Sequence, residues 1–360
     1  MRGWIAMGKM KVLLTVNEIK PGMIVAEDFK DESTILVNSG IELTEAIISK
    51  LRNKYFFNKI AVFKEEEIVI NNIEVKKEKT VEEIDESFNE FTFDVGAIFQ
   101  GMYSDGICDI EEISNFSKKI EGELNSPSAV IKNIVLNGSG KDAIYRHCVN
   151  VAALSSILGK WVGLSEAELT LLTYSAILHD FGKTKIDKDV LYKLDSLSSQ
   201  EISDIKNHAV VSYNEIRKIK DLNNAVSYGV LMHHERLDGS GYPLGLKEDK
   251  IHPFARIIAI ADVFDAVNSD RIHKKKKGPF EALEIIQKES LGKLDYKYCK
   301  VFLEHIVNYY MGESVLLNTN KICKIVQINI NDLTRPLLFD GSEFIDLKQE
   351  KDLFVVALVE

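Results

Sequence analysis

Residues 233–243 read His233-His234-Glu235-Arg236-Leu237-Asp238-Gly239-Ser240-Gly241-Tyr242-Pro243. Two adjacent histidines that lead into a glycine-rich turn are difficult to explain as packing. A second polar pair, His179-Asp180, follows the apolar run of residues 171–178. Such a pair would cost several kcal/mol if it were buried without partners, and a bound metal ion removes that penalty. The two stretches together indicate a metal site.

The sequence around these stretches has the period of α-helices from about Ile84 onward. Ser165 with Glu168 and Ser198 with Glu201 fit the capping-box pattern, so helices should begin near Glu166 and Ser199. Residues 255–268 are apolar on one face, with Asp262 and Asp265 as neighbours on the other. The pattern predicts a mainly α-helical core.

Composition excludes several classes of protein. With a formal net charge of -10 over 360 residues and a pI near 5.5, the chain lacks the basic surface that a nucleic-acid polymer requires. No apolar run approaches the roughly 20 residues of a membrane span. Four scattered cysteines, at positions 108, 148, 299 and 323, suit a reducing compartment. We therefore expect a soluble cytoplasmic protein.

Five histidines and two aspartates could meet at one point of such a core. They are His147, His179, Asp180, His208, His233, His234 and Asp262. Any one of these histidines alone would be read as a core or surface residue. Neutral imidazole and carboxylate are ligands that divalent iron, manganese or zinc accept. Seven are too many for one ion, but they suit two ions that share a carboxylate and a hydroxide at about 3.5–4 Å separation, which is an arrangement that cleaves phosphate esters.

The order of these blocks resembles the HD-GYP branch of the HD-domain phosphohydrolases. The matching blocks lie between about residues 142 and 312: His147, residues 179–183, His208, residues 233–243 and residues 261–265. The resemblance implies a helical HD domain that hydrolyses cyclic di-GMP. It also implies two ligand sets. His147, His179, Asp180 and Asp262 would hold one metal ion, and Asp180, His208, His233 and His234 would hold the other.

The resemblance further implies roles for residues near the metal ions. Asp180 would bridge the two ions, and Lys183 would stabilise the scissile phosphate or protonate the leaving group. Asp265, Arg271 and Lys274 match family positions near the substrate, and Arg271 suits a bidentate phosphate contact. Gly241 and Tyr242 belong to a loop that lines the substrate entrance in the family. A purely structural turn is the alternative for this loop, and Glu235 is a candidate to orient an imidazole.

One departure from the family affects the number of metal ions. Some relatives place a glutamate four residues before the first histidine, where it helps to hold a third ion. That position is Ala143 in this chain, and alanine cannot ligate. We therefore predict two divalent ions, with mixed histidine and carboxylate ligation favouring iron or manganese.

The regions outside the helical domain have sequence patterns that predict strands and a charged linker. We expect a small β-rich N-terminal module at residues 1–65, a charged linker with helices at 66–125, the catalytic domain at 126–315 and a β-leaning extension at 316–360. Candidate strands include residues 11–16, 34–37, 321–328, 337–339 and 353–359, and a helical stretch covers residues 43–54. The N-terminal module is a candidate for docking on the core or for mediating a homodimer.

The predicted activity is hydrolysis of cyclic di-GMP to linear pGpG, and to GMP if a second cut follows. Two alternatives remain open. One is an enzyme of the same family for another cyclic dinucleotide, such as cyclic GMP-AMP. The other is a catalytically silent receptor or scaffold that binds the ligand or a diguanylate cyclase (GGDEF) domain.

Overall fold

The structure is a computed structural model of the whole chain. It describes residues 9–16, 18–31, 34–55, 59–65, 78–104, 110–123, 125–140, 144–270 and 278–359. Ala143, Arg271 and Lys274 lie outside these ranges, as does Cys108. The chain divides into two compact units, residues 1–75 and residues 76–360.

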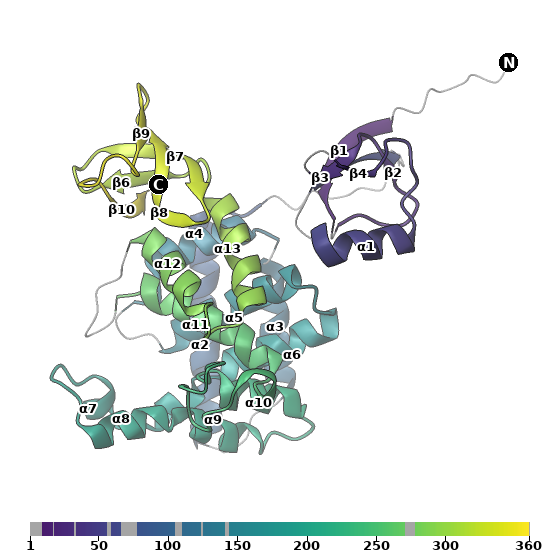
Figure 1. Ribbon diagram of the computed structural model, residues 1–360. Coiled ribbons are helices and arrows are strands. Elements are labelled where there is room, and N and C mark those ends of the chain that lie inside the picture. Colours follow the sequence, from purple (N-terminus) through teal and green to yellow (C-terminus); the bar gives the residue numbers. More distant parts are fainter. Residues whose placement is uncertain are drawn as a thin grey trace. The chain divides into compact units, whose positions relative to one another are not determined.

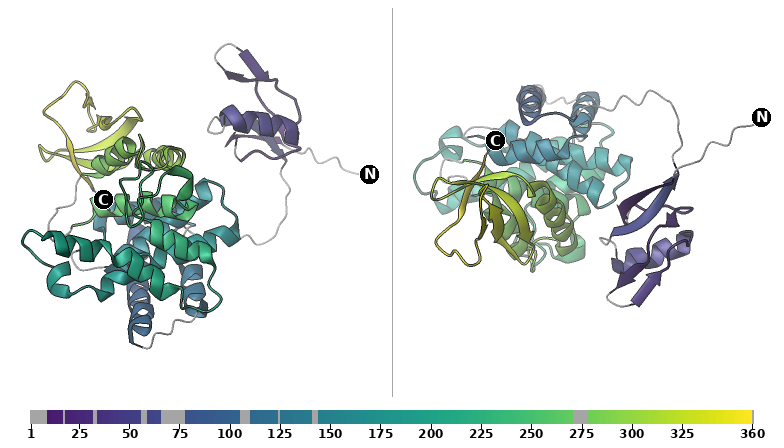
Figure 2. Two further views of the ribbon diagram at one scale, coloured as in Figure 1. Left: turned by 60° about the horizontal axis from the view of Figure 1, so that its bottom comes forward. Right: turned by 90° about the horizontal axis from the view of Figure 1, so that it is seen from above.

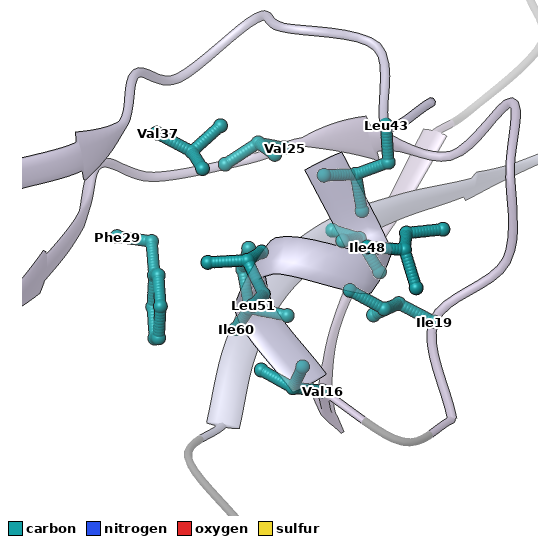
Figure 3. Close-up of a cluster of buried hydrophobic side chains, with 10 residues drawn as sticks. Val16, Ile19, Val25, Phe29, Val37, Leu43, Ile48, Leu51 and Ile60 are labelled. Carbon is teal, nitrogen blue, oxygen red and sulfur yellow. The ribbon is translucent and has the colours of Figure 1, made fainter. Parts of the chain in front are cut away.

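The first unit is a small α+β fold. Its elements are β1 (Lys9–Thr15), β2 (Ile24–Val25), β3 (Phe29–Asp31), β4 (Thr34–Val37), α1 (Glu45–Tyr55) and β5 (Lys59–Glu65). The strands form an antiparallel sheet in the order β1-β5-β2 and a separate hairpin of β3 and β4. Buried aliphatic side chains from strands, turns and α1, among them Val25, Ile48 and Ile60, form its core (Figure 3). This unit therefore has a hydrophobic core of its own.

The second unit is a helical bundle followed by a sheet (Figure 1). Its α-helices are α2 (Val81–Ser104), α3 (Ile110–Glu123), α4 (Pro127–Asn137), α5 (Ile144–Trp161), α6 (Glu166–Leu178), α7 (Lys188–Leu191), α8 (Ser199–Lys206), α9 (His208–Ile216), α10 (Asn224–Met232), α11 (Pro253–Asn268), α12 (Pro279–Glu289) and α13 (Tyr296–Tyr310). Two 3₁₀ helices, η1 (Phe181–Lys185) and η2 (Glu248–Lys250), connect some of them. No helix among the described residues combines the length and apolar character needed to cross a membrane.

Helix α5 lies at the centre of the bundle. Every side chain from Arg146 to Gly159 is buried, and the helix packs against α2, α6 and α11. Both predicted capping boxes are present, at the starts of α6 and α8, where each serine hydroxyl accepts from the backbone amide of the glutamate three residues later. The predicted helical core is thus confirmed.

Helices α2 and α3 belong to the same unit as this core. Helix α2 buries seven apolar side chains along one face and packs against α4, α5 and α3. Its apolar residues recur at helical spacing, and that face needs a partner. Helix α2 therefore buries its apolar face within the second unit, where it contacts both α5 and η1.

The C-terminal sheet closes one end of the bundle (Figure 2). Its strands are β6 (Ser314–Leu317), β7 (Ile322–Asn329), β8 (Asp332–Phe339), β9 (Phe344–Asp346) and β10 (Val355–Val359). They pair antiparallel in the order β10-β6-β7-β8-β9, and β8 and β10 pack on α12. The sequence-based prediction of a mainly α fold with a β-rich segment at each end is confirmed.

Candidate metal centre

The seven predicted ligand residues come together in the second unit, and five of them stand at helix ends. His147 lies in the first turn of α5 and Asp262 lies on α11. The others stand where helices begin or end: His179 and Asp180 follow α6, His208 begins α9, and His233 and His234 follow α10. All seven side chains are at most 15% exposed.

Asp180 stands at the centre of the cluster, and its two oxygens face different histidines. Oδ2 lies 3.4 Å from His147 Nε2 and 3.5 Å from His179 Nε2. Oδ1 lies 3.2 Å from His208 Nε2 and 4.0 Å from His233 Nε2. One carboxylate therefore presents one oxygen to each of two groups of ligands.

These two groups have the composition of metal sites. Potential donor atoms of His147, His179 and Asp180 lie within 4.8 Å of one another, and so do those of Asp180, His208, His233 and His234. Asp262 connects the groups, since its Oδ1 is 3.2 Å from His147 Nε2 and its Oδ2 is 3.8 Å from His234 Nδ1. The structure thus brings together the residues of both ligand sets that the family resemblance implies, and their binding of metal stays a prediction.

Backbone carbonyls orient three of the imidazoles. In each case Nδ1 lies 2.6–2.7 Å from the carbonyl oxygen three residues earlier: His179 with Ala176, His208 with Ile205, and His233 with Val230. A carbonyl can only accept, so Nδ1 carries the hydrogen and Nε2 keeps its lone pair. Each of these Nε2 atoms lies within 4.0 Å of an Asp180 oxygen, so a cation held by Asp180 could accept the lone pairs.

The described protein atoms leave this arrangement incomplete without a cation. Asp180 Oδ1 is buried and accepts no hydrogen bond within the described part of the chain. His208 Nε2 is near it but has no hydrogen to donate. His208 and His233 also bring their Nε2 atoms to 3.3 Å, and His147 and His179 bring theirs to 3.4 Å. Opposed lone pairs and a buried anionic oxygen fit a divalent ion between them.

The electrostatic environment favours the ligand forms of most of these groups. Burial lowers the pKa of His179 to about 4, and it also holds the pKa values of His233 and His234 well below the usual range. Burial alone would raise the pKa of Asp180, but the Lys183 ammonium and the imidazoles outweigh it and lower that pKa. Neutral imidazoles around an ionised carboxylate are the forms that bind metal.

His147 differs from the other histidines. Burial would lower its pKa, but contacts with Asp262 and Asp265 outweigh this effect and raise the pKa to about 9. Its Nδ1 lies 2.6 Å from Asp265 Oδ2. A carboxylate behind the ring makes the imidazole a stronger donor toward a cation on the other side.

Asp265 lies behind His147, away from solvent. It is fully buried, and it accepts from Ser139 Oγ at 2.5 Å and from Asn150 Nδ2 at 2.7 Å. Asn150 in turn accepts from Arg146 Nε at 3.2 Å. The family resemblance implies that Asp265 lies near the substrate, but protein groups engage both of its oxygens. Asn150 is not among the predicted site residues, although a polar residue three positions after His147 faces the same side of a helix.

The arginine extends this network to α2. Its guanidinium donates to Asp85 Oδ1 at 2.8 Å and to Asn89 Oδ1 at 2.7 Å. A continuous series of polar side chains thus connects α2, through Arg146, Asn150 and Asp265, with His147.

The residue 233–243 loop is held by Glu235. This side chain is 3% exposed, and it accepts from the backbone amides of Leu244 at 2.6 Å and Leu246 at 2.8 Å. Both oxygens of Glu235 therefore bind the backbone of this loop. Gly241 allows the chain to fold back, since a Cβ there would lie within 2.5 Å of backbone atoms of His234, Glu235 and Arg236. Only glycine fits so close an approach.

Tyr242 and Lys183 border the ligand cluster. The Tyr242 ring lies 4.6 Å from the His234 ring, between centroids, and burial raises the pKa of its hydroxyl. Lys183, on η1, places its Nζ 2.6 Å from Asp180 Oδ2 while its side chain remains 17% exposed. A basic group and an aromatic group therefore stand beside the candidate metal ions.

Comparison with known proteins agrees with this geometry. Residues 129–297 match the family model of the HD domain. Cyclic di-GMP phosphodiesterase PdeB of Borreliella burgdorferi is 30% identical over 53% of this chain and 50% of its own length. Cyclic di-GMP phosphodiesterase PA4108 of Pseudomonas aeruginosa is 29% identical over 59% of this chain and 51% of its own length. The 3'3'-cGAMP-specific phosphodiesterase 1 of Vibrio cholerae is 32% identical over 52% of this chain and 43% of its own length. The chain spans about half the length of these relatives.

Proposed function

We propose that the protein is a metal-dependent phosphodiesterase of the HD-GYP family that hydrolyses cyclic di-GMP to linear pGpG, because residues 129–297 match the HD-domain family model and similar proteins bear the name cyclic di-GMP phosphodiesterase. GMP would follow from a second cut. The observation that carries the proposal is Asp180, whose two oxygens each face a separate group of histidines. Shared carboxylates of this kind occur in dinuclear sites that cleave phosphate esters.

In the proposed site, one ion is held by His147, His179, Asp180 and Asp262, and the other by Asp180, His208, His233 and His234. Iron or manganese suits this donor set. Two such ions would lower the pKa of a water molecule and withdraw charge from the phosphoryl oxygens. We propose two ions and not a third, because Ala143 offers no ligand atom.

Side chains of the protein would then position the substrate and balance its negative charge. Lys183 Nζ, held by Asp180, can donate to a phosphoryl oxygen or protonate the leaving oxygen. The Tyr242 ring packs beside the His234 ring, and by family resemblance Gly241 and Tyr242 would line the substrate entrance. By family resemblance, Arg271 and Lys274 contribute further phosphate contacts. Asp265 acts through His147, which it orients from behind.

A second substrate is supported by one specific finding, because relatives of similar identity bear the name 3'3'-cGAMP-specific phosphodiesterase. The two activities share the metal chemistry and differ in base recognition. A diguanylate cyclase (GGDEF) domain as partner and a homodimer are further proposals from the sequence.

The test combines metal content with turnover. Protein purified without oxygen is loaded with iron or manganese, measured by elemental analysis, and incubated separately with cyclic di-GMP and 3'3'-cGAMP while products are followed by chromatography. We expect about two ions per chain and pGpG as the first product. Asp180→Asn should lose metal and turnover, whereas His305→Gln, which alters a histidine outside the cluster, should retain both. Metal-loaded protein that binds a cyclic dinucleotide but cleaves none would identify a receptor instead.

A further inference from the structure

A pocket of about 440 Å³ lies beside Lys183, outside the cluster of ligands. Its walls come from α2, the start of α5, η1 and α7, and they include Gln100, Tyr103, Tyr145, Lys183, Lys188 and Tyr192. This volume is within the range of small-molecule sites. Lys183 lines the pocket and also contacts Asp180, so one side chain is common to the pocket and the candidate metal centre.

Aromatic rings build the inner wall of this pocket. Tyr145 packs against α2 where Gly96 has no side chain, because a Cβ at Gly96 would lie 3.5 Å from the ring. The ring also meets Phe99 edge to face at 5.7 Å, and Phe99 meets Phe181 in the same way at 5.2 Å. Such contacts hold the aromatic surface in a defined position.

The outer wall combines an exposed ring with positive charge. Tyr103 is 53% exposed, and Lys185 Nζ lies 3.8 Å from its ring centroid. Lys183 and Lys188 line the pocket, and Lys185 lies between them in the sequence. Gln100 is exposed at the same wall, and its amide can both donate and accept hydrogen bonds.

An aromatic surface, ammonium groups and an exposed amide are the chemistry that recognises a nucleotide. Bases stack on aromatic side chains, lysines attract phosphate, and an amide can read a base edge. We propose that this pocket binds one purine base of a cyclic dinucleotide whose scissile phosphodiester lies at Lys183. The inference rests on the proposed function and adds the place of base recognition.

The position of the pocket in the chain has a consequence for selectivity. Gln100 and Tyr103 lie on α2, before residues 129–297, which match the HD domain. Preference among cyclic dinucleotides is therefore set partly by a helix that precedes the HD domain.

Variants of the α2 wall test the proposal. Tyr103→Ala should raise KM for the preferred cyclic dinucleotide about 10-fold with little change in kcat, since stacking on one aromatic ring is worth about that factor. Tyr103→Phe keeps the ring and should restore KM. Gln100→Ala should change the ratio of kcat/KM between cyclic di-GMP and 3'3'-cGAMP. The control is Phe93→Ala, an aromatic residue of the same helix that is 80% exposed and does not line the pocket.

A binding measurement separates this proposal from the proposed function. The wild type and each variant are titrated calorimetrically with GMP and with ribose 5-phosphate. The difference between the two binding affinities measures the contribution of the base. If the wild type cleaves cyclic dinucleotides but Tyr103→Ala and Gln100→Ala behave like Phe93→Ala, the base site is overturned and the phosphodiesterase stands. If the wild type cleaves none, the proposed function fails. The pocket then stands only if GMP binds more tightly than ribose 5-phosphate and Tyr103→Ala removes that difference.

Discussion

Asp265 shows how a residue without a direct ligand role can support the centre. Its carboxylate lies 2.6 Å from the nitrogen of His147 that faces away from Asp180. Replacement by asparagine keeps the size of the side chain but removes the charge that makes His147 a stronger donor.

We predict that Asp265→Asn lowers metal affinity about 10- to 100-fold. The expected measurement is metal retained against increasing chelator, determined by elemental analysis. Asp204→Asn, on the exposed part of α8, is the control and should retain metal like the wild type. Unchanged retention in Asp265→Asn would mean that His147 is oriented without the carboxylate.

At the scale of elements, the contact between η1 and α9 determines the spacing of the two ligand groups. The Gly182 amide donates to Ser212 Oγ at 2.7 Å, and that hydroxyl donates to the His179 carbonyl at 3.0 Å. A Cβ on Gly182 would lie 2.1 Å from the His208 carbonyl oxygen. Neither element can accept a side chain here without moving.

Gly182→Ala should therefore separate η1 from α9 and displace His208 from Asp180. We expect the free energy of unfolding to fall by about 3 kcal/mol and bound metal to decrease, as measured by denaturant titration and elemental analysis. Gly122→Ala is the matched control, since a Cβ there meets open space on a helix and should be neutral or slightly stabilising. Equal stabilities for the two variants would contradict the close contact.

The start of α8 gives a prediction that depends on pH. Hydrogen bonds from Lys193, and then from Ser198, lower the pKa of Glu201 to about 2. The folded value lies below that of the unfolded chain, about 4.3. The carboxylate therefore stabilises the fold above that pH, and the contribution is lost as the pH falls toward 2.

Glu201→Gln should accordingly lower the denaturation midpoint at about pH 7, with a smaller difference from the wild type at about pH 3. Glu166→Gln, an exposed first-turn glutamate of α6, controls for the loss of one negative charge. A difference of the same size at both pH values would show that Glu201 acts without its ionisation.

At the scale of the whole molecule, the two units have separate cores. The core of the first unit includes Val25, Ile48 and Ile60, and the second is built around α5. All ligand residues and the α2 pocket belong to the second unit. A chain of residues 76–360 should therefore fold, bind metal and turn over like the full chain, as measured by thermal unfolding, elemental analysis and kcat. If the chain of residues 76–360 retained metal but lost turnover, the first unit would have a role in catalysis.

The ligand cluster could be predicted from sequence because its members lie in short motifs whose order is recognisable. His179-Asp180 and His233-His234 are adjacent pairs. They lie close together in space if the helices pack as they do in the family that the sequence resembles. The partners of Asp265 and Glu235 could not be predicted in this manner. Ser139 lies 126 positions from Asp265, and whether Glu235 turns toward an imidazole or toward Leu244 depends on the path of a loop. The α2 pocket likewise arises only when α2 packs against α5 and η1.

The three carbonyls that orient the imidazoles have one further consequence. Ala176, Ile205 and Val230 lie in the last turns of α6, α8 and α10. The C-terminal end of a helix carries a partial negative charge from its aligned peptide dipoles. Three such ends converge beside two buried carboxylates, so the bundle itself creates a negative potential at this point. A divalent cation would neutralise the repulsion between these negative helix ends and the carboxylates. Metal binding would therefore stabilise the folded bundle in addition to its proposed role in phosphodiester hydrolysis.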